Sequence, residues 1–302
     1  MSITLCDKNR SDFNFGEVLR NEKCEVFVIN LDRRPDRWEQ ISKHLNELHC
    51  LNFHRVRAVD GLKESPELAR KIIRLESEKS NYEVPTNRQF GVLGCLKSHL
   101  KALQLASQIL NYQDKALILE DDCFFIENAA NILKKSFNEL NSDWKVLMLG
   151  AIYGTSPGFV IKKTHLMRVY SACAAHAYVV NRHSCSLMIR RIEDLLKSKI
   201  IFPVDEMFTK YQQIEEWYAT HPLIAGQLSG NFSDIDEMIK VNTNECFKLG
   251  VTINLKIWLW MKIRPFLSKL LMEMSRRVIP IWQCTRDKFE ANNLEEIFFQ
   301  KK

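Results

Sequence analysis

Three acidic side chains in a row, Glu120, Asp121 and Asp122, interrupt an apolar stretch that reads LILEDDCFF over residues 117–125. Neighbouring carboxylates repel one another, and burying one without a partner is costly. A divalent cation turns that repulsion into coordination. Because Glu120 and Asp122 are two residues apart, both point the same way in an extended chain, while Asp121 points elsewhere. The spacing predicts a site on Glu120 and Asp122 for a hard, oxygen-preferring ion such as Mn²⁺ or Mg²⁺.

Arginines follow another apolar run, in the segment INLDRRPDRW over residues 29–38. Arg33, Arg34 and Arg37 suit a diphosphate, since guanidinium groups bind phosphate oxygens in a bidentate manner. A helix N-terminus after this loop would add its dipole. A basic surface turn is the alternative for this segment, just as a helix cap or a solvated turn is the alternative for the acids.

The segment FGVLGCLKSHLKAL, over residues 90–103, combines glycines with a serine and a histidine. Gly91 and Gly94 precede an expected helix, and glycine at such a place permits close backbone approach to a ligand. Ser98 and His99 then follow on the helix. His99 has two interpretations, a ligand-facing group or a hydrogen-bonded core histidine.

The elements that must position these residues alternate between two kinds. Short, nearly continuous apolar runs are typical of strands buried on both faces, and apolar residues at helical spacing predict helices between them. This alternation predicts an α/β fold with a mostly parallel sheet flanked by helices, whose ligands bind at the carboxyl ends of the strands. Strands are expected over residues 25–31, 53–59, 116–120, 145–150 and 176–181, and helices from Pro35 and over 66–80, 93–110, 128–140 and 183–197.

Composition narrows the class of protein further. Of the 302 residues, 46% are hydrophobic and 26% charged, as in an ordinary globular protein, and the net charge of +6 is too small and dispersed to indicate nucleic acid. The nine cysteines include no CxxC pair, which favours reduced thiols over a disulfide framework or a zinc site. With no secretory leader and no apolar run of the ~18 residues that a membrane span needs, a cytoplasmic protein is expected.

Changes in residue composition divide the chain into three parts. Residues 1–24 are a polar lead-in that we expect to be irregular, and residues 25–242 carry the alternating elements. Residues 243–302 are basic and aromatic, and predict an amphipathic helical segment interrupted at Pro265. Such a segment can lie at a membrane interface, here the cytoplasmic face of an inner membrane; a helical pair packed on the domain is the alternative.

Seven segments, taken together and in this order, resemble glycosyltransferase family 25, which includes bacterial lipooligosaccharide galactosyltransferases and the collagen galactosyltransferases. They are VFVINLDRRPDRW, FHRVRAVDG, GVLGCLKSHLKAL, ALILEDDCFF, HAYVVNRHSCSLMI, PVDEMF and HPLIAGQLSGNFSDI. The resemblance implies a GT-A fold with a Rossmann-like nucleotide-sugar half (25–150) and an acceptor half (151–242). It also implies a UDP-sugar donor, usually UDP-galactose, and Mn²⁺. The absent leader and small size resemble the bacterial branch, whose acceptor is a lipooligosaccharide or lipopolysaccharide glycan.

The resemblance also implies roles for particular residues. The EDD stands where the family carries its DxD-type metal motif, with Glu120 in place of the first Asp. The donor site is expected to comprise Asn30, Leu31, Arg33, Arg37, Asp60, Gly94, Ser98, His99 and Asp121.

Family members transfer sugars with inversion, which needs a carboxylate base for the acceptor hydroxyl and a cation for the leaving UDP. We expect Asp205 to be the base, with Glu206 and Asp234 as further candidates. A cap for a helix starting at Glu206 is the alternative for Asp205. His176 and His221 are additional candidates for the metal, although His176 begins an apolar strand and fits buried structure better.

Two other classes of function stay open. A non-catalytic relative would bind a nucleotide or a glycan as an interaction module, yet such relatives usually lose the metal-binding acids that are intact here. Another metal–phosphate enzyme, such as a nucleotidyltransferase, would need a triphosphate cradle, and the sequence has no GxxxxGK[ST] loop. The expected partners are therefore a UDP-sugar and a glycan or glycolipid acceptor, with no nucleic acid.

Overall fold

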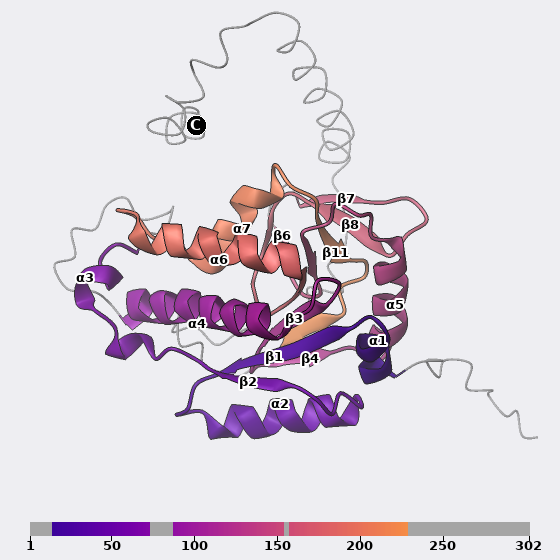
Figure 1. Cartoon of the computed structure of the whole chain (residues 1–302), viewed down its shortest axis with the longest axis horizontal. Helices are drawn as coiled ribbons and strands as arrows, with labels where there is room; N and C mark the ends of the chain where they lie inside the picture. The colour runs from indigo at the N-terminus through magenta and orange to yellow at the C-terminus, as the bar shows by residue number, and fades with distance from the viewer. Residues whose placement is uncertain (1–13, 73–86, 154–156, 229–302) are drawn as a thin grey trace, which may run out of the picture. The chain divides into compact units, whose positions relative to one another are not determined.

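A mixed sheet lies at the centre of the chain, of which the computed structural model describes residues 14–72, 87–153 and 157–228 (Figure 1). The strands of this sheet are β1 (Cys24–Asn30), β2 (His54–Arg57), β3 (Lys115–Glu120), β5 (Val146–Met148), β7 (Gly158–Val160), β8 (Leu166–Val169), β10 (Ala177–Asn181) and β11 (Trp217–Thr220). Their order is β2-β1-β3-β10-β5-β11-β8-β7. Strands β10 and β8 run opposite to the others, so the expected direction of most strands is confirmed.

Helices cover both faces of the sheet, as expected for an α/β fold (Figure 1). They are α1 (Phe15–Asn21), α2 (Pro35–Glu47), α3 (Pro66–Ala69), α4 (Asn87–Ile109), α5 (Ala129–Glu139), α6 (Arg182–Lys197) and α7 (Val204–Gln212), with a 3-10 helix η1 (Gly61–Lys63). Apolar side chains of α3, α4, α6 and α7 pack on one face, and those of α1, α2 and α5 pack on the other.

The central strands are apolar on both sides because both faces are buried. In β1, Val26 and Val28 join the core beneath α2 and α5, while Phe27 and Ile29 join the core beneath α4. Successive side chains of a strand point to opposite faces, so a strand covered by helices on both sides needs an unbroken apolar run. The sequence pattern of 25–31 and 116–120 is explained in this way.

A small second sheet forms directly after the acidic residues. Strand β4 (Cys123–Phe125) pairs antiparallel with β12 (Ala225–Gln227), which places Gln227 opposite Cys123. A further pair joins β6 (Ile152–Tyr153) and β9 (Ala172–Cys173). The β4–β12 pair therefore fastens the chain that follows Asp122 to a segment about a hundred residues later.

Three sequence-based expectations are wrong. Phe15–Asn21, in the supposedly irregular lead-in, form α1, because Asn14 caps the helix and Phe15 and Leu19 are buried against the core. Helix α4 begins at Asn87, so Gly91 and Gly94 lie inside the helix and do not precede it. Of the helix expected over 66–80, the described part is helical only at Pro66–Ala69.

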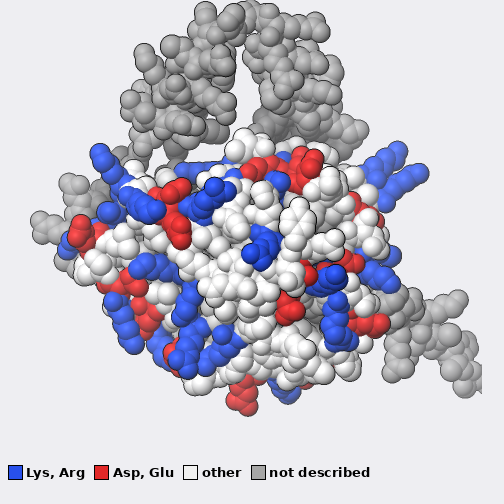
Figure 2. Space-filling model, viewed as in Figure 1, with Lys and Arg blue, Asp and Glu red and all other residues white. Residues whose placement is uncertain are grey.

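Several expectations concern parts of the chain outside the described residues. Asp234 lies there, as does the segment 243–302 with its proposed membrane contact. Within the described ranges, no helix is long and apolar enough to cross a bilayer. None of the cysteines in these ranges forms a disulfide. Figure 2 shows acidic and basic side chains interspersed over one face of the molecule, in line with the dispersed charge of the sequence.

Candidate active site

A pocket of about 290 Å³ opens where β1 and β3 end, between those strand ends and α4. Its wall contains the residues that the sequence analysis had singled out along four separate segments. These are Leu31, Arg33, Arg37, Asp60, Gly94, Ser98, His99, Glu120, Asp121 and Asp122. The structure thus brings together all the expected donor-site and metal residues except Asn30, which lies beneath Asp121.

The wall formed by α4 is held by close backbone packing. A Cβ atom at Gly94 would lie 2.8 Å from both the Val59 oxygen and the Gly61 nitrogen. The Ser98 hydroxyl accepts a hydrogen bond from Val59 N (2.8 Å) and donates one to Gly94 O (2.6 Å). Gly94 is therefore needed because the helix approaches the loop after β2, and the close approach is to the protein's own chain.

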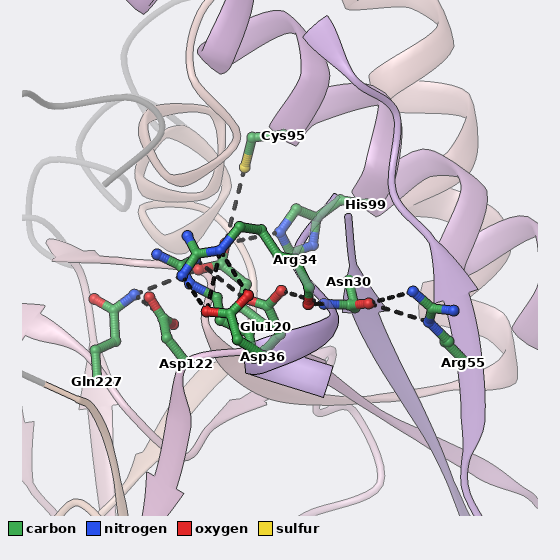
Figure 3. Close-up of polar contacts among 11 residues, drawn as sticks. Asn30, Arg34, Asp36, Arg55, Cys95, His99, Glu120, Asp122 and Gln227 are labelled. Carbon is green, nitrogen blue, oxygen red and sulfur yellow. Dashed lines mark hydrogen bonds and ion pairs between the residues drawn. The ribbon is translucent and has the colours of Figure 1, made fainter. Parts of the chain in front are cut away.

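Asp121 is turned away from its two acidic neighbours, as the spacing predicted. It accepts hydrogen bonds from Asn30 Nδ2 (2.7 Å) and from Arg37 Nη1 (3.3 Å), both buried. Asn30 Oδ1 in turn accepts from Arg55 Nη2 at 2.6 Å, a contact that the sequence did not suggest (Figure 3). These bonds hold Asn30 and Asp121 in fixed orientations at the floor of the pocket.

Burial has the largest effect on the pKa of Asp121. Burial raises the pKa of Asp121 to about 6, the Asn30 hydrogen bond and Arg37 oppose this, and the carboxylates of Asp122 and Glu120 add to it. Burial thus outweighs the effects of Asn30 and Arg37 at Asp121.

Gln227, on β12, contacts the carboxylates of Glu120 and Asp122. Its Nε2 lies 3.4 Å from Glu120 Oε2 and 3.2 Å from Asp122 Oδ1 (Figure 3). Leu228 N donates to Asp122 O at 2.9 Å. Glu120 and Asp122 therefore converge on one side, as their spacing predicted. Gln227 stands in the quoted HPLIAGQ segment, but a glutamine carries no signal that would have marked it.

The second oxygen of Glu120 faces α4. Its Oε1 lies 3.4 Å from His99 Nε2 and 3.8 Å from Cys95 Sγ (Figure 3). The other ring nitrogen of His99 is 3.0 Å from the hydroxyl of Tyr178, deep in the core. His99 thus satisfies both interpretations that the sequence left open, since it is buried, hydrogen-bonded and part of the pocket wall.

The three arginines of the loop have different surroundings. Arg37 is buried on Asp121, whereas Arg33 lines the pocket with a side chain that is 44% exposed and lies 3.7 Å from Asp60. Arg34 is not in the pocket wall and pairs with Asp36 at 2.8 Å. Pro35 starts α2 at its first turn, as expected.

Asp205 stands in the first turn of α7, outside the pocket wall. Pro203 is the N-cap of this helix, so the alternative of Asp205 as the cap of a helix starting at Glu206 is wrong. Its carboxylate accepts from Glu206 N (3.0 Å) and Ala174 N (3.4 Å). Burial raises the pKa of Asp205, and repulsion from the charge of Glu120 adds a smaller increase. The two carboxylates therefore interact electrostatically.

The two histidines considered for the metal lie elsewhere. His176 is buried beside Gly150, and its backbone oxygen accepts a bond from Glu120 N at 2.9 Å. Its interpretation as buried structure is confirmed. His221 N donates to His165 O at 2.7 Å, and His221 is absent from the residues that line the pocket in the described chain.

The donor atoms fit a hard divalent cation. Carboxylate oxygens of Glu120 and Asp122 converge near one amide, and oxygen ligands are those that Mn²⁺ and Mg²⁺ take. A cation beside Asp121 would favour the ionised form of this carboxyl, which burial disfavours.

The fold and this site define an α/β protein with an acidic cluster and arginines at the carboxyl edge of its sheet. Residues 23–208 match the family described as Glycosyltransferase family 25 (LPS biosynthesis protein). The match extends over more than half of the sequence, and the chain belongs to this family.

Similar proteins agree with this assignment. The chain is 30% identical over 133 residues to procollagen galactosyltransferase 2 of Mus musculus and of Homo sapiens, covering 42% of this chain and 20% of each relative. It thus spans only a fifth of the length of these relatives.

Two solved structures of glycosyltransferases are also similar at 11% identity. One is a glycosyltransferase involved in glycosylation of the major capsid of PBCV-1, with a TM-score of 0.39 over 75% of this chain and 98% of that one. The other is a Drosophila galactosyltransferase 7 variant in complex with manganese, UDP-Gal and xylobiose, with a TM-score of 0.28 over 74% of this chain and 79% of that one.

Proposed function

We propose that this protein is a metal-dependent, inverting galactosyltransferase that uses UDP-galactose and acts on a lipooligosaccharide or lipopolysaccharide glycan. The observation that carries the proposal is the convergence of Glu120 and Asp122 in a pocket that also contains Arg33 and Arg37. Membership of family 25 supports sugar transfer, and the family's description supports the acceptor class. The named activity of the procollagen relatives supports galactose.

The donor half of the site binds and orients the nucleotide sugar. Glu120 and Asp122 would hold the cation, which when bound supplies positive charge to the diphosphate as it leaves. Arg33 is exposed enough to reach a phosphate oxygen directly, whereas Arg37 keeps Asp121 in place. Asp60, which pairs with Arg33, stands on the loop that closes the opposite wall.

The acceptor half must remove a proton from the attacking hydroxyl. Asp205 suits this task, because a carboxylate whose pKa is raised by burial is a stronger base than an exposed one. Glu206 is the neighbouring alternative on the same turn of α7. Inversion requires the base and the leaving UDP on opposite sides of the sugar, which would lie between Asp205 and the acids at the end of β3.

Release of UDP tests the proposal. The full-length protein is incubated with UDP-galactose, Mn²⁺ and a lipooligosaccharide that lacks its terminal galactose, with UDP-glucose and UDP-N-acetylglucosamine as matched donors. We expect acceptor-dependent release of UDP from UDP-galactose that stops when the cation is chelated. A folded protein that releases UDP from none of the donors would overturn the proposal. Metal-independent UDP binding without turnover would instead indicate an interaction module.

A further inference from the structure

A second group of ligand atoms lies beside the oxygen pair, on the α4 side of the pocket. Cys95 and His99 are four residues apart on α4, so both project from the same face of the helix toward the end of β3. Cys95 Sγ, a ring nitrogen of His99 and a Glu120 oxygen all lie within 4.8 Å of one another. In the described ranges, this is the one set of such side chains close enough to share an ion.

We propose that Cys95, His99 and Glu120 form a binding site for a thiophilic divalent cation of the Zn²⁺ class, distinct from the oxygen-donor pair that Glu120 makes with Asp122. The inference goes beyond sugar transfer and does not depend on it. Sulfur and imidazole nitrogen are ligands that Zn²⁺ prefers over Mn²⁺ or Mg²⁺. The absence of a CxxC pair disfavours a zinc site made of cysteines, but Cys95 and His99 stand one helical turn apart on α4 and offer one sulfur and one nitrogen ligand.

Two of the three distances between the ligand atoms are close to those of a tetrahedral site, and the third is within 4.8 Å. With ordinary zinc bond lengths, the edges between sulfur, nitrogen and oxygen ligands of a tetrahedron measure about 3.3 to 3.6 Å. Glu120 Oε1 lies 3.4 Å from His99 Nε2 and 3.8 Å from Cys95 Sγ. Binding would require Cys95 Sγ and His99 Nε2, now within 4.8 Å of each other, to approach to about 3.6 Å or less.

The surroundings of His99 orient it for this role. Its Nδ1 lies 3.0 Å from the Tyr178 hydroxyl, so Nε2 is left pointing at Glu120 and Cys95. A fixed partner on the far ring nitrogen is the usual support of a metal-bound histidine. All three residues line the pocket, so water or a ligand atom in the pocket could supply a fourth ligand.

The two cations would compete for one side chain. Glu120 presents Oε1 to Cys95 and His99 and Oε2 to Gln227 beside Asp122. An ion on the sulfur side would draw Glu120 away from the oxygen side. On binding, the Cys95 thiol releases its proton to water, so the affinity for Zn²⁺ is expected to rise with pH.

Cobalt spectroscopy of the full-length, metal-free protein tests the proposal. Co²⁺ on a thiolate gives a charge-transfer absorption that oxygen-only sites lack. We expect this band to reach its limit at one equivalent and to disappear when Zn²⁺ is added. In Cys95→Ser the band is lost and Co²⁺ binding weakens more than about 10-fold, since loss of even an outer-shell partner costs that much.

Matched variants separate this site from other thiols and from the oxygen pair. Cys173→Ser should keep the band, because Cys173 belongs to no group of three possible metal ligands among the described residues. Asp122→Asn should keep it too. A band that survives in Cys95→Ser with native circular dichroism, or no band in the unmodified protein, would overturn the proposal. Either result leaves Mn²⁺-dependent release of UDP untouched, so the two proposals fail separately.

Discussion

Two arginine–carboxylate pairs in this molecule, one buried and one partly buried, have opposite electrostatic outcomes. Arg37 meets Asp121 in the pocket, and Arg191 on α6 meets Glu215 just before β11, with Nη1 to Oε2 at 2.9 Å. At Glu215 burial raises the pKa, but hydrogen bonds from Arg191 and Trp217 and the charges of Arg191 and Lys145 outweigh it, so the net pKa is lowered. At Asp121 burial and the charges of Asp122 and Glu120 outweigh the hydrogen bond from Asn30 and the charge of Arg37, and the pKa rises to about 6.

The difference shows what each region is built to do. The Arg191–Glu215 pair has more positive than negative partners, and Arg191 also stacks on the ring of Tyr211. The charge of Glu215 is thus stabilised by the protein's own groups, and we expect the pair to contribute to the stability of the fold. At Asp121 burial is the largest influence, and it outweighs the hydrogen bond from Asn30 and the charge of Arg37. A buried carboxylate whose ionised form is disfavoured is expected where an external cation would complete the site.

The largest expected effect comes from removing Asp122, one of the two carboxylates proposed to hold the cation. Asp122→Ala should lower turnover more than about 10⁴-fold, since cation stabilisation of a leaving group contributes several kcal/mol. The free energy of unfolding should change little, because the loss of the Gln227 contact is offset by relief of repulsion. Donor-dependent UDP release and circular dichroism measure the two effects. Gross unfolding would defeat this interpretation; Asp143→Ala, at an exposed acid, is the control.

Asp205→Asn should lower kcat about 10³-fold, within the range of general base catalysis. Because burial raises the pKa of Asp205, the unmodified enzyme should lose activity, as pH falls, at a higher pH than an ordinary aspartate would give. The same raised pKa means that the ionised form is destabilised at neutral pH, so Asp205→Asn should be at least as stable to denaturant. Glu206→Gln is the matched variant, and a greater loss there would move the role of base to Glu206.

Arg191→Leu tests the structural pair. It leaves Glu215 charged and poorly compensated, so the free energy of unfolding should fall by about 2 to 3 kcal/mol. Arg37→Leu should cost less, because Asp121 already has a raised pKa and can take up a proton. Urea denaturation without divalent cations compares them. An equal or greater loss for Arg37→Leu would remove the distinction between the two regions.

Cation binding should stabilise the protein through the pocket. Mn²⁺ at ten times its Kd should raise the free energy of unfolding by about 1.4 kcal/mol. The increase should vanish in Asp122→Ala and persist in Arg191→Leu, which is remote from the acids. Thermal denaturation with and without Mn²⁺ gives the comparison. A shift of equal size in Asp122→Ala would mean that Mn²⁺ binds elsewhere.

The smallest effect concerns pH. The pKa of Glu215 is lowered in the folded state, so its contribution to stability is present above its ordinary value of 4.5 and is lost as pH falls through the folded pKa. Unfolding free energies at pH 6 and pH 4 should therefore differ more in the unmodified protein than in Arg191→Leu, by less than about 1 kcal/mol. If the unfolding free energy changed equally with pH in both proteins, the lowered pKa of Glu215 could not be attributed to Arg191.

Much of the fold could be predicted because its signals are local. The apolar runs gave β1, β3, β5 and β10 within a residue or two, and helical spacing gave α2, α5 and α6. The start of α4 was missed because glycines within a helix resemble glycines before one. Helix α1 was missed because its apolar face is short.

The sequence by itself determined that three acids leave a buried strand at the carboxyl edge of an α/β sheet, because apolar runs and a spacing of two are properties of neighbouring residues. Only the tertiary structure decided how those acids are shared. Gln227 reaches Asp122 from 105 positions along the chain, and Asn30 reaches Asp121 from 91. Such contacts depend on strand order and on packing of α4 against the loop at Gly61, which no local pattern encodes. For that reason Glu120 could be expected at a metal site, while its second face, toward Cys95 and His99, emerged only from the fold.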